Sequence, residues 1–231
     1  MREALVHRGP DGPGELSISA PGSEMEGWFG HRRLKVIDVS ESAHQPMLGA
    51  DGAVALTYNG EVYNFRELRR ELESRGHRFA SSGDTEVVLR AYEEWGAGFV
   101  GRLDGMFALA VWDARTATLL LARDRTGKKP LFYHVHHGRL TFGSEIKALV
   151  ACPWVPAAVD SGQLAEFFTF GYVPHPHTLY RGIEQVPPAS LVTFGADGAA
   201  RTRRYWDAAP GAATPASGAP DTGRIAELLR N

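Results

Sequence analysis

The segment YNGEVYNFRELRRELESRGHRF, residues 58–79, predicts a strand that passes through a glycine turn directly into a helix. Asn-Gly is a strong hairpin signal, but no matching second strand follows it here. Asn64 instead begins a capping box for a helix expected over Phe65–Arg75. Such a turn leaves backbone N–H groups and the Asn59 amide facing solvent, which is how oxyanion holes are commonly built. Two interpretations of Asn59 and Gly60 stay open: a plain turn or a pair of catalytic donors.

On both sides of this segment, short apolar stretches separated by turn residues predict a fold rich in strands. The expected strands are Leu16–Ser19, Trp28–Val36, Val54–Tyr58, Gly105–Trp112, Thr118–Arg123, Leu131–Val135 and Arg139–Phe142. The expected further helices are Thr85–Trp95, Ser144–Val150 and Ser161–Thr169.

The composition excludes several classes of protein. The 231 residues carry 25 Lys+Arg against 27 Asp+Glu, a net charge of -2, whereas a dedicated nucleic-acid binder usually has a basic surplus. No apolar run approaches the ~20 residues that span a membrane, and the first residues lack a signal-peptide core. The single cysteine excludes a disulfide framework. We therefore expect a cytoplasmic protein that binds neither nucleic acid nor membrane.

Composition also predicts the domain organisation. Residues 1–207 form the expected globular domain. Residues 208–223 are almost wholly Ala, Pro, Gly, Ser, Thr and Asp, which is typical of a linker. Residues 224–231 begin an amphipathic helix that the sequence cuts short. This pattern predicts a second domain after the linker.

Other candidate residues have an ordinary interpretation beside the functional one. Asp84 suits a helix N-terminus, and Arg33 suits an exposed strand, but the pair also suits recognition of an ammonium and a carboxylate. The residue types of the motif at His7–Gly12 are typical of a turn. The histidines at 134, 136 and 137 lack a recognised ligand spacing, so no metal is expected. Cys152 is interpreted as structural.

Taken together, eight motifs occur in a specific order. They are HRGPDG (7–12), GHRRLKVID (30–38), HQPM (44–47), the segment 58–79, SGDTEV (82–87), LDGMFALAVWD (103–113), ARDRTGKKPLFY (122–133) and GSEIKAL (143–149). The series resembles the N-terminal glutaminase domain of glutamine-hydrolysing asparagine synthetases. Three later stretches, Gly171–Pro174, Tyr180–Ile183 and Arg204–Trp206, are similar to the segment that leads into the synthetase domain of that family.

The resemblance implies an α+β fold, the α/β/β/α sandwich of N-terminal-nucleophile hydrolases, in which two antiparallel sheets lie between helix layers. It implies that L-glutamine is the substrate and that an N-terminal cysteine thiolate attacks the side-chain amide, with the α-amine as its base. Water hydrolyses the resulting thioester, and the ammonia reaches the synthetase domain, where ATP has activated aspartate.

The resemblance also assigns roles to individual residues. It places Arg33 at the glutamine α-carboxylate, with Leu34, Lys35, Val36 and Ile37 on the same binding strand. It places Asn59 and Gly60 in the oxyanion hole, Glu61 in the binding turn, and Asp84 at the α-ammonium. The site is expected to need no metal or other cofactor, while ATP and magnesium belong to the synthetase domain.

The sequence departs from the family at both ends. The family's nucleophilic cysteine lies upstream of HRGPD, on a strand that these residues do not include, and Cys152 does not match it. The synthetase domain is likewise not included. We therefore expect residues 1–231 to form the glutamine-binding half of an asparagine synthetase and to be inactive alone. Whether that enzyme is a homodimer stays open. Two alternatives stay open: a catalytically dead binding module, and an amide ligase with another acceptor.

Overall fold

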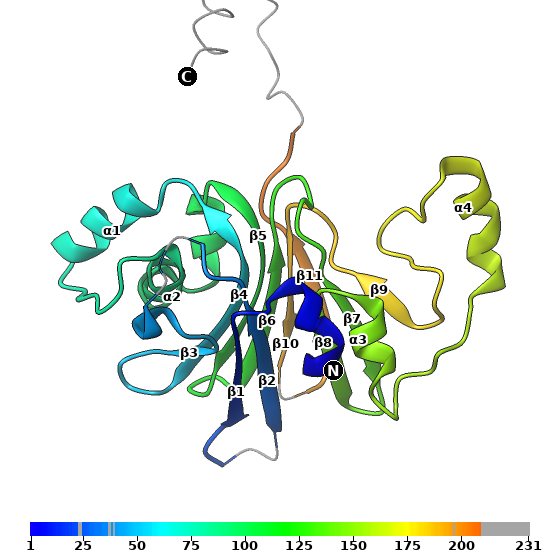
Figure 1. The fold of residues 1–231 in the computed structure, drawn as a ribbon, viewed down its shortest axis with the longest axis horizontal. Helices are drawn as coiled ribbons and strands as arrows, with labels where there is room; N and C mark the ends of the chain where they lie inside the picture. The colour runs from blue at the N-terminus through cyan, green and yellow to red at the C-terminus, as the bar shows by residue number, and fades with distance from the viewer. Residues whose placement is uncertain (23–24, 37, 39, 196, 209–231) are drawn as a thin grey trace, which may run out of the picture.

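Six antiparallel strands form the central sheet, in the order β11-β10-β6-β5-β4-β3 (Figure 1). They are β3 Met47–Leu48, β4 Val54–Val62, β5 Gly105–Asp113, β6 Thr118–Arg123, β10 Ser190–Phe194 and β11 Ala200–Arg204. This computed structural model describes residues 1–22, 25–36, 38, 40–195 and 197–208. The strands β5 and β6 read as nearly continuous apolar runs because both of their faces are covered.

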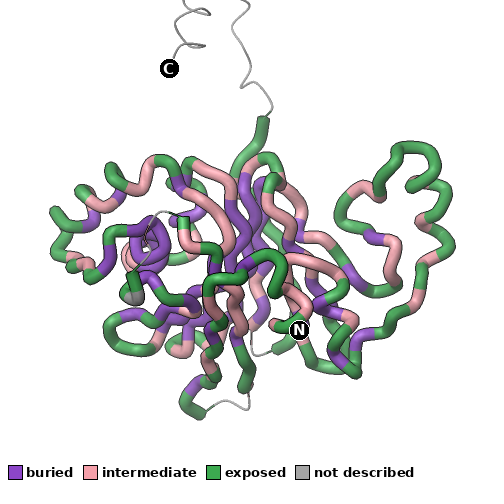
Figure 2. Tube along the Cα trace, in the orientation of Figure 1, coloured by how far each residue is buried: buried purple, intermediate pink, exposed green. Residues whose placement is uncertain are grey.

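Two helices cover one face of this sheet: α1 Phe65–Ser74 and α2 Asp84–Trp95, which continues into η3 Gly96–Arg102. Val87, Val88 and Leu89 of α2 are fully buried against the sheet strands. Figure 2 shows α2 and the strands β4, β5 and β6 as the most deeply buried part of the molecule, whereas only Leu68 and Leu72 of α1 are buried. Asn64 precedes α1 as predicted, but its side chain makes no capping hydrogen bond. It instead donates from Nδ2 to the Arg102 carbonyl oxygen and accepts the Asp104 backbone N–H at Oδ1.

The other face carries a second layer of strands. A hairpin, β1 Gly12–Ser19 and β2 Glu26–Arg33, lies beside a three-stranded sheet of β8 Arg139–Gly143, β7 Phe132–His136 and β9 Ile183–Gln185. Phe29, Trp112 and Val192 belong to the core between the two layers. Outside the second layer lie α3 Ile146–Val150 and the N-terminal η1 Arg2–Arg8, so the predicted α/β/β/α sandwich is confirmed.

One arm projects from this sandwich between α3 and β9 (Figure 1). It carries η4 Ser161–Gln163 and α4 Leu164–Phe170, and no residue of α4 is buried. Phe168 is 80% exposed and Phe170 is 58% exposed. The helix predicted over Ser161–Thr169 therefore forms, but its aromatic side chains face solvent.

Several predicted bounds are wrong. The strand expected to reach Val36 ends at Arg33, and the strand expected to end at Tyr58 continues to Val62. The sequence also does not predict several short elements: η1, η2 Glu41–Ala43, β3, β9, β10 and β11. The linker and final helix expected over 208–231 lie outside the described residues, apart from Ala208. Among the described helices, none has the length and apolar character that crossing a bilayer requires.

Candidate functional site: a cleft between the two strand layers

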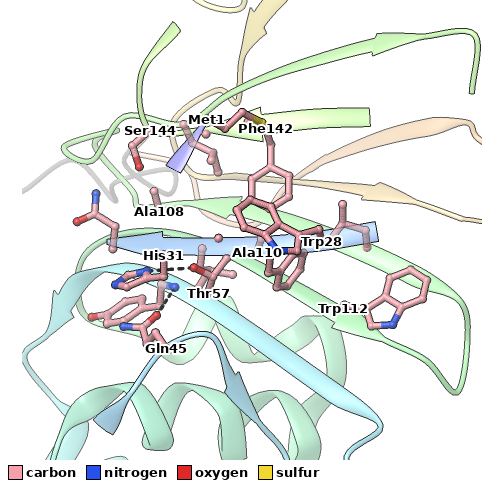
Figure 3. A pocket seen from close by; sticks show the side chains of 18 of the residues that line it. Met1, Trp28, His31, Gln45, Thr57, Ala108, Ala110, Trp112, Phe142 and Ser144 are labelled. Carbon is pink, nitrogen blue, oxygen red and sulfur yellow. Dashed lines mark hydrogen bonds between the residues drawn. The ribbon is translucent and has the colours of Figure 1, made fainter. Parts of the chain in front are cut away.

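A cleft of about 1730 Å³ runs between the hairpin β1–β2, strand β8 and the central strands β4 and β5. Its lining includes most of the predicted site residues: Arg33, Leu34, Val36, Asn59, Gly60, Glu61 and Asp84. Lys35 is not part of the lining, and Ile37 lies outside the described residues. Figure 3 shows His31 and Thr57 joined by a hydrogen bond in this cleft, with the rings of Trp28 and Phe142 further along it.

Asn59, Gly60 and Glu61 lie within strand β4 and do not form the expected turn. Gly60 pairs with Phe107 of β5, and the chain leaves the sheet only after Val62. A Cβ atom on Gly60 would lie 2.3 Å from the carbonyl oxygen of Met106. The glycine is therefore required for the close approach of β5.

The Asn59 side chain has an unusual environment. Its Nδ2 atom is buried and has no hydrogen-bond partner, although the residue lines the cleft. A buried amide donor without a partner costs about 1–3 kcal/mol, so such groups are rare in proteins. An N–H held ready in a concave site is what stabilisation of a developing oxyanion requires.

Arg33 is the last residue of β2, and its side chain is almost fully buried. Its guanidinium donates from Nη1 to the carbonyl oxygen of Ser40 across 2.8 Å and from Nη2 to the carbonyl oxygen of Asp38. An arginine has five N–H donors, so donors remain for an anion in the cleft. Leu34 and Val36 lie in the irregular segment after the strand and are 59% and 70% exposed.

Asp84 is the first residue of α2 and is buried. Its Oδ2 atom accepts hydrogen bonds from the Tyr58 hydroxyl at 2.7 Å and from the Val62 backbone N–H at 3.0 Å. Both donors come from β4, which fixes the carboxylate relative to Asn59 and Gly60. A buried carboxylate at this place suits an ammonium group.

The site also contains residues to which the sequence assigned no role, and two of them, Gln45 and His31, lie inside its ordered motifs. Gln45 of HQPM accepts the Tyr58 backbone N–H at 2.7 Å, which ties β4 to the segment before β3. His31 of GHRRLKVID contacts Thr57 Oγ1 through Nδ1 at 3.2 Å. Burial, and then the nearby Arg33 and His44, lower the pKa of His31 to about 4. The neutral imidazole is therefore the form present at neutral pH.

The motif HRGPDG forms a turn against the end of β2. The Asp11 backbone N–H donates to the carbonyl oxygen of Arg33 at 3.0 Å, and Asp11 Oδ2 accepts the Lys35 N–H at 2.8 Å. A Cβ atom on Gly9 would lie 2.2 Å from the Arg32 carbonyl oxygen, so only glycine fits there. This motif therefore positions the chain on both sides of Arg33.

Cys152 lines the end of the cleft where Met1 also lies. It packs with Leu149, Val155 and Ile183, and burial raises the pKa of its thiol. A protonated, buried thiol is a poor nucleophile, which agrees with its interpretation as structural. The described residues contain no cluster of three or more His, Cys, Asp or Glu side chains that could hold a metal ion.

The cleft separates two strand edges of the second layer. Within the described sheets, β2 pairs only with β1, and β8 pairs only with β7, while residues of both strands line the same cleft. The rings of Phe29 on β2 and Phe142 on β8 meet edge to face at 5.6 Å between centroids. Two strand edges that are unpaired in the described sheets, with these aromatic rings between them, can bind an extended segment of backbone.

Comparison with known proteins gives a consistent result. Residues 1–206 match the family model described as a glutamine amidotransferase domain. The chain is 42% identical to asparagine synthetase [glutamine-hydrolyzing] 3 of Bacillus subtilis over 90% of its length, and 36% identical to asparagine synthetase [glutamine-hydrolyzing] 1 of the same organism. These matches cover 33% and 32% of the two relatives, so the chain spans about a third of their length.

A solved structure shows the same fold. The glutamine phosphoribosylpyrophosphate amidotransferase from B. subtilis, complexed with ADP and GMP, superposes with a TM-score of 0.62 at 19% sequence identity. The match covers 88% of this chain and 45% of that one.

Proposed function

Because the chain belongs to the glutamine amidotransferase domain family, we propose that its cleft binds L-glutamine and supplies ammonia to an asparagine synthetase reaction. The observation that supports this most is the composition of one cleft. It combines a buried guanidinium at Arg33, a buried carboxylate at Asp84 and the unpartnered amide of Asn59.

The two charged groups recognise the amino-acid end of glutamine. Arg33 binds the α-carboxylate through guanidinium donors that the loop carbonyls leave available, and Asp84 accepts from the α-ammonium. Their opposite charges fix which way the ligand lies, so that its side-chain amide extends from the two charged groups along the cleft. Glu61, the neighbour of Gly60 on β4, also lines the cleft and contributes to glutamine binding.

The Asn59 amide and the Gly60 backbone N–H act on the reacting amide. A cysteine thiolate attacks the amide carbon, and the carbonyl oxygen gains negative charge that these donors stabilise. The C–N bond then breaks, and the nitrogen leaves as ammonia after protonation. Water hydrolyses the thioester to glutamate and restores the thiol.

The cysteine is supplied by an extended segment that precedes residue 1 and lies between β2 and β8. Those two edges offer backbone donors and acceptors on both sides of such a segment. Residues 1–231 therefore bind glutamine without hydrolysing it, and Cys152 takes no part.

The acceptor chemistry belongs to the part of the relatives that this chain does not match. There, ATP and magnesium would activate aspartate in the synthetase domain, within a cytoplasmic enzyme. The activities for which the relatives are named favour this reaction over a binding module and over a ligase with another acceptor.

Calorimetric titration of the chain with L-glutamine tests the binding step. Saturable binding that Asp84→Asn weakens supports the proposal, whereas no binding at millimolar ligand overturns it. For the chemical step, an extension with an exposed N-terminal cysteine is expected to release ammonia from glutamine. Ammonia release by the chain alone that Cys152→Ala abolishes would refute the assignment of the nucleophile.

A further inference from the structure

The side chain of Asp38 joins the loop after β2 to the loop before α2. Its Oδ1 atom accepts the Ser40 backbone N–H at 2.8 Å and the Ser40 hydroxyl at 2.6 Å. Its Oδ2 atom accepts the Ser82 backbone N–H at 2.9 Å and the Ser82 hydroxyl at 3.0 Å. One carboxylate therefore joins two segments that lie 44 residues apart in the sequence.

The first of these segments holds Arg33. The backbone carbonyls of Asp38 and Ser40 both accept hydrogen bonds from the Arg33 guanidinium. Ser40 is in turn fixed by the Asp38 carboxylate. Any movement of the loop at Asp38 therefore changes where the guanidinium lies.

The second segment leads into Asp84. Ser82 and Gly83 immediately precede it, and a Cβ atom on Gly83 would lie only 3.1 Å from the Asp38 Cβ. The loop and the start of α2 are thus in direct contact at this point. The hydrogen bonds from Ser40 and Ser82 keep the pKa of Asp38 well below its usual range, so the bridge keeps its charge at neutral pH.

We propose that Asp38 is a positioning residue that sets the separation between Arg33 and Asp84, and thereby the selectivity of the cleft for an α-amino acid. The inference rests on the proposed function, because it assigns the α-carboxylate and the α-ammonium of one ligand to Arg33 and Asp84. Asp38 itself lines the cleft, but it acts through these two groups. A ligand that contacts both groups depends on their separation, whereas a ligand that contacts only one does not.

The test compares L-glutamine with glutaramate, which has the same amide and one carboxylate but no α-amino group. Both ligands are titrated into the parent chain, Asp38→Ala and a control, Asp51→Ala. Asp51 is an exposed aspartate that also accepts a backbone N–H two residues on, from Ala53 at 2.9 Å. Thermal unfolding of each variant establishes the folded fraction.

We expect Asp38→Ala to weaken L-glutamine binding about tenfold or more, because it removes charge-assisted hydrogen bonds. The same variant should weaken glutaramate binding by less than about twofold. Asp51→Ala should leave both affinities unchanged. Ser82→Ala, which removes only one of the four hydrogen bonds, should move the selectivity in the same direction by a smaller factor. This milder variant keeps the test decisive if Asp38→Ala does not fold.

Two outcomes overturn the inference. In one, the Asp38 or Ser82 variant binds L-glutamine as the parent does. In the other, both ligands weaken by the same factor, which indicates a general structural role. Failure of the parent chain to bind L-glutamine is a different result, because it refutes the proposed function itself.

Discussion

The Tyr58 hydroxyl donates to the same Asp84 oxygen, Oδ2, that accepts the Val62 backbone N–H, at 2.7 and 3.0 Å. Burial, followed by the charge of Asp84, raises the pKa of Tyr58 well above its usual value, so the hydroxyl stays a donor. Strand β4 therefore carries Asn59 and Gly60 and also holds the carboxylate that is proposed to bind the ammonium end of glutamine.

The first prediction concerns this carboxylate. Asp84→Asn should weaken glutamine binding roughly ten- to a hundredfold, because it removes a charged acceptor for the ammonium group. Calorimetric affinity and the melting temperature are measured together. Asp84→Ala should in addition lower stability, since the Tyr58 hydroxyl and the Val62 N–H lose their acceptor. An Asn variant that binds glutamine as the parent does contradicts the ammonium role.

Asn59→Ala separates catalysis from folding. In a chain extended by an N-terminal cysteine, we expect the rate of ammonia release to fall on the order of 10²–10³, with little change in KM. The melting temperature should not fall, because the Asn59 Nδ2 atom has no partner to lose. A destabilised variant with normal turnover per folded molecule would instead support a purely structural role.

Gly60→Ala is expected to disturb folding first. The new methyl group would lie 2.3 Å from the Met106 carbonyl oxygen, so β4 and β5 must separate. We expect a loss of unfolding free energy of about 2 kcal/mol or more, measured by urea denaturation. Gly98→Ala serves as the control, because a Cβ there meets nothing within 4 Å. Equal stability of the two variants would contradict the packing account.

The buried His31 predicts a loss of stability in mild acid. Its pKa of about 4 in the folded state lies below the ordinary 6.5, so the unfolded chain binds the proton more readily. The stability from neutral His31 is complete above pH 6.5 and is lost as the pH falls toward 4, by up to about 1.4 kcal/mol per pH unit. Urea denaturation at pH 7, 6 and 5 should therefore give a flatter profile for His31→Gln. Parallel profiles would show that His31 does not titrate in this window.

The exposed aromatic residues of α4 predict self-association of the chain. Sedimentation velocity should show oligomers that increase with concentration, and the double change Phe168→Ser and Phe170→Ser should reduce them. The open edges of β2 and β8 are a second source of association. If the double variant still associates as the parent does, the strand edges and not α4 are responsible. A monomer at all concentrations contradicts both sources.

The sequence alone determined the local chemistry and the layers of the fold. Alternation, turn residues and continuous apolar runs predicted β6 over Thr118–Arg123 and the helix α2 to within one residue, because these signals depend on neighbours in the chain. The ordered motifs also predicted the family. Short edge strands such as β9 and β11 carried too weak a pattern to be found.

Only the tertiary structure decided what the site residues contact. Asn59-Gly60 reads locally as a turn, yet pairing with β5 extends β4 through Val62 and makes the glycine a packing requirement. The bridge at Asp38 joins residues 44 positions apart, and no local pattern reports such a contact. Propensity and periodicity act over a few residues, whereas the cleft is formed by strands that only long-range burial brings together.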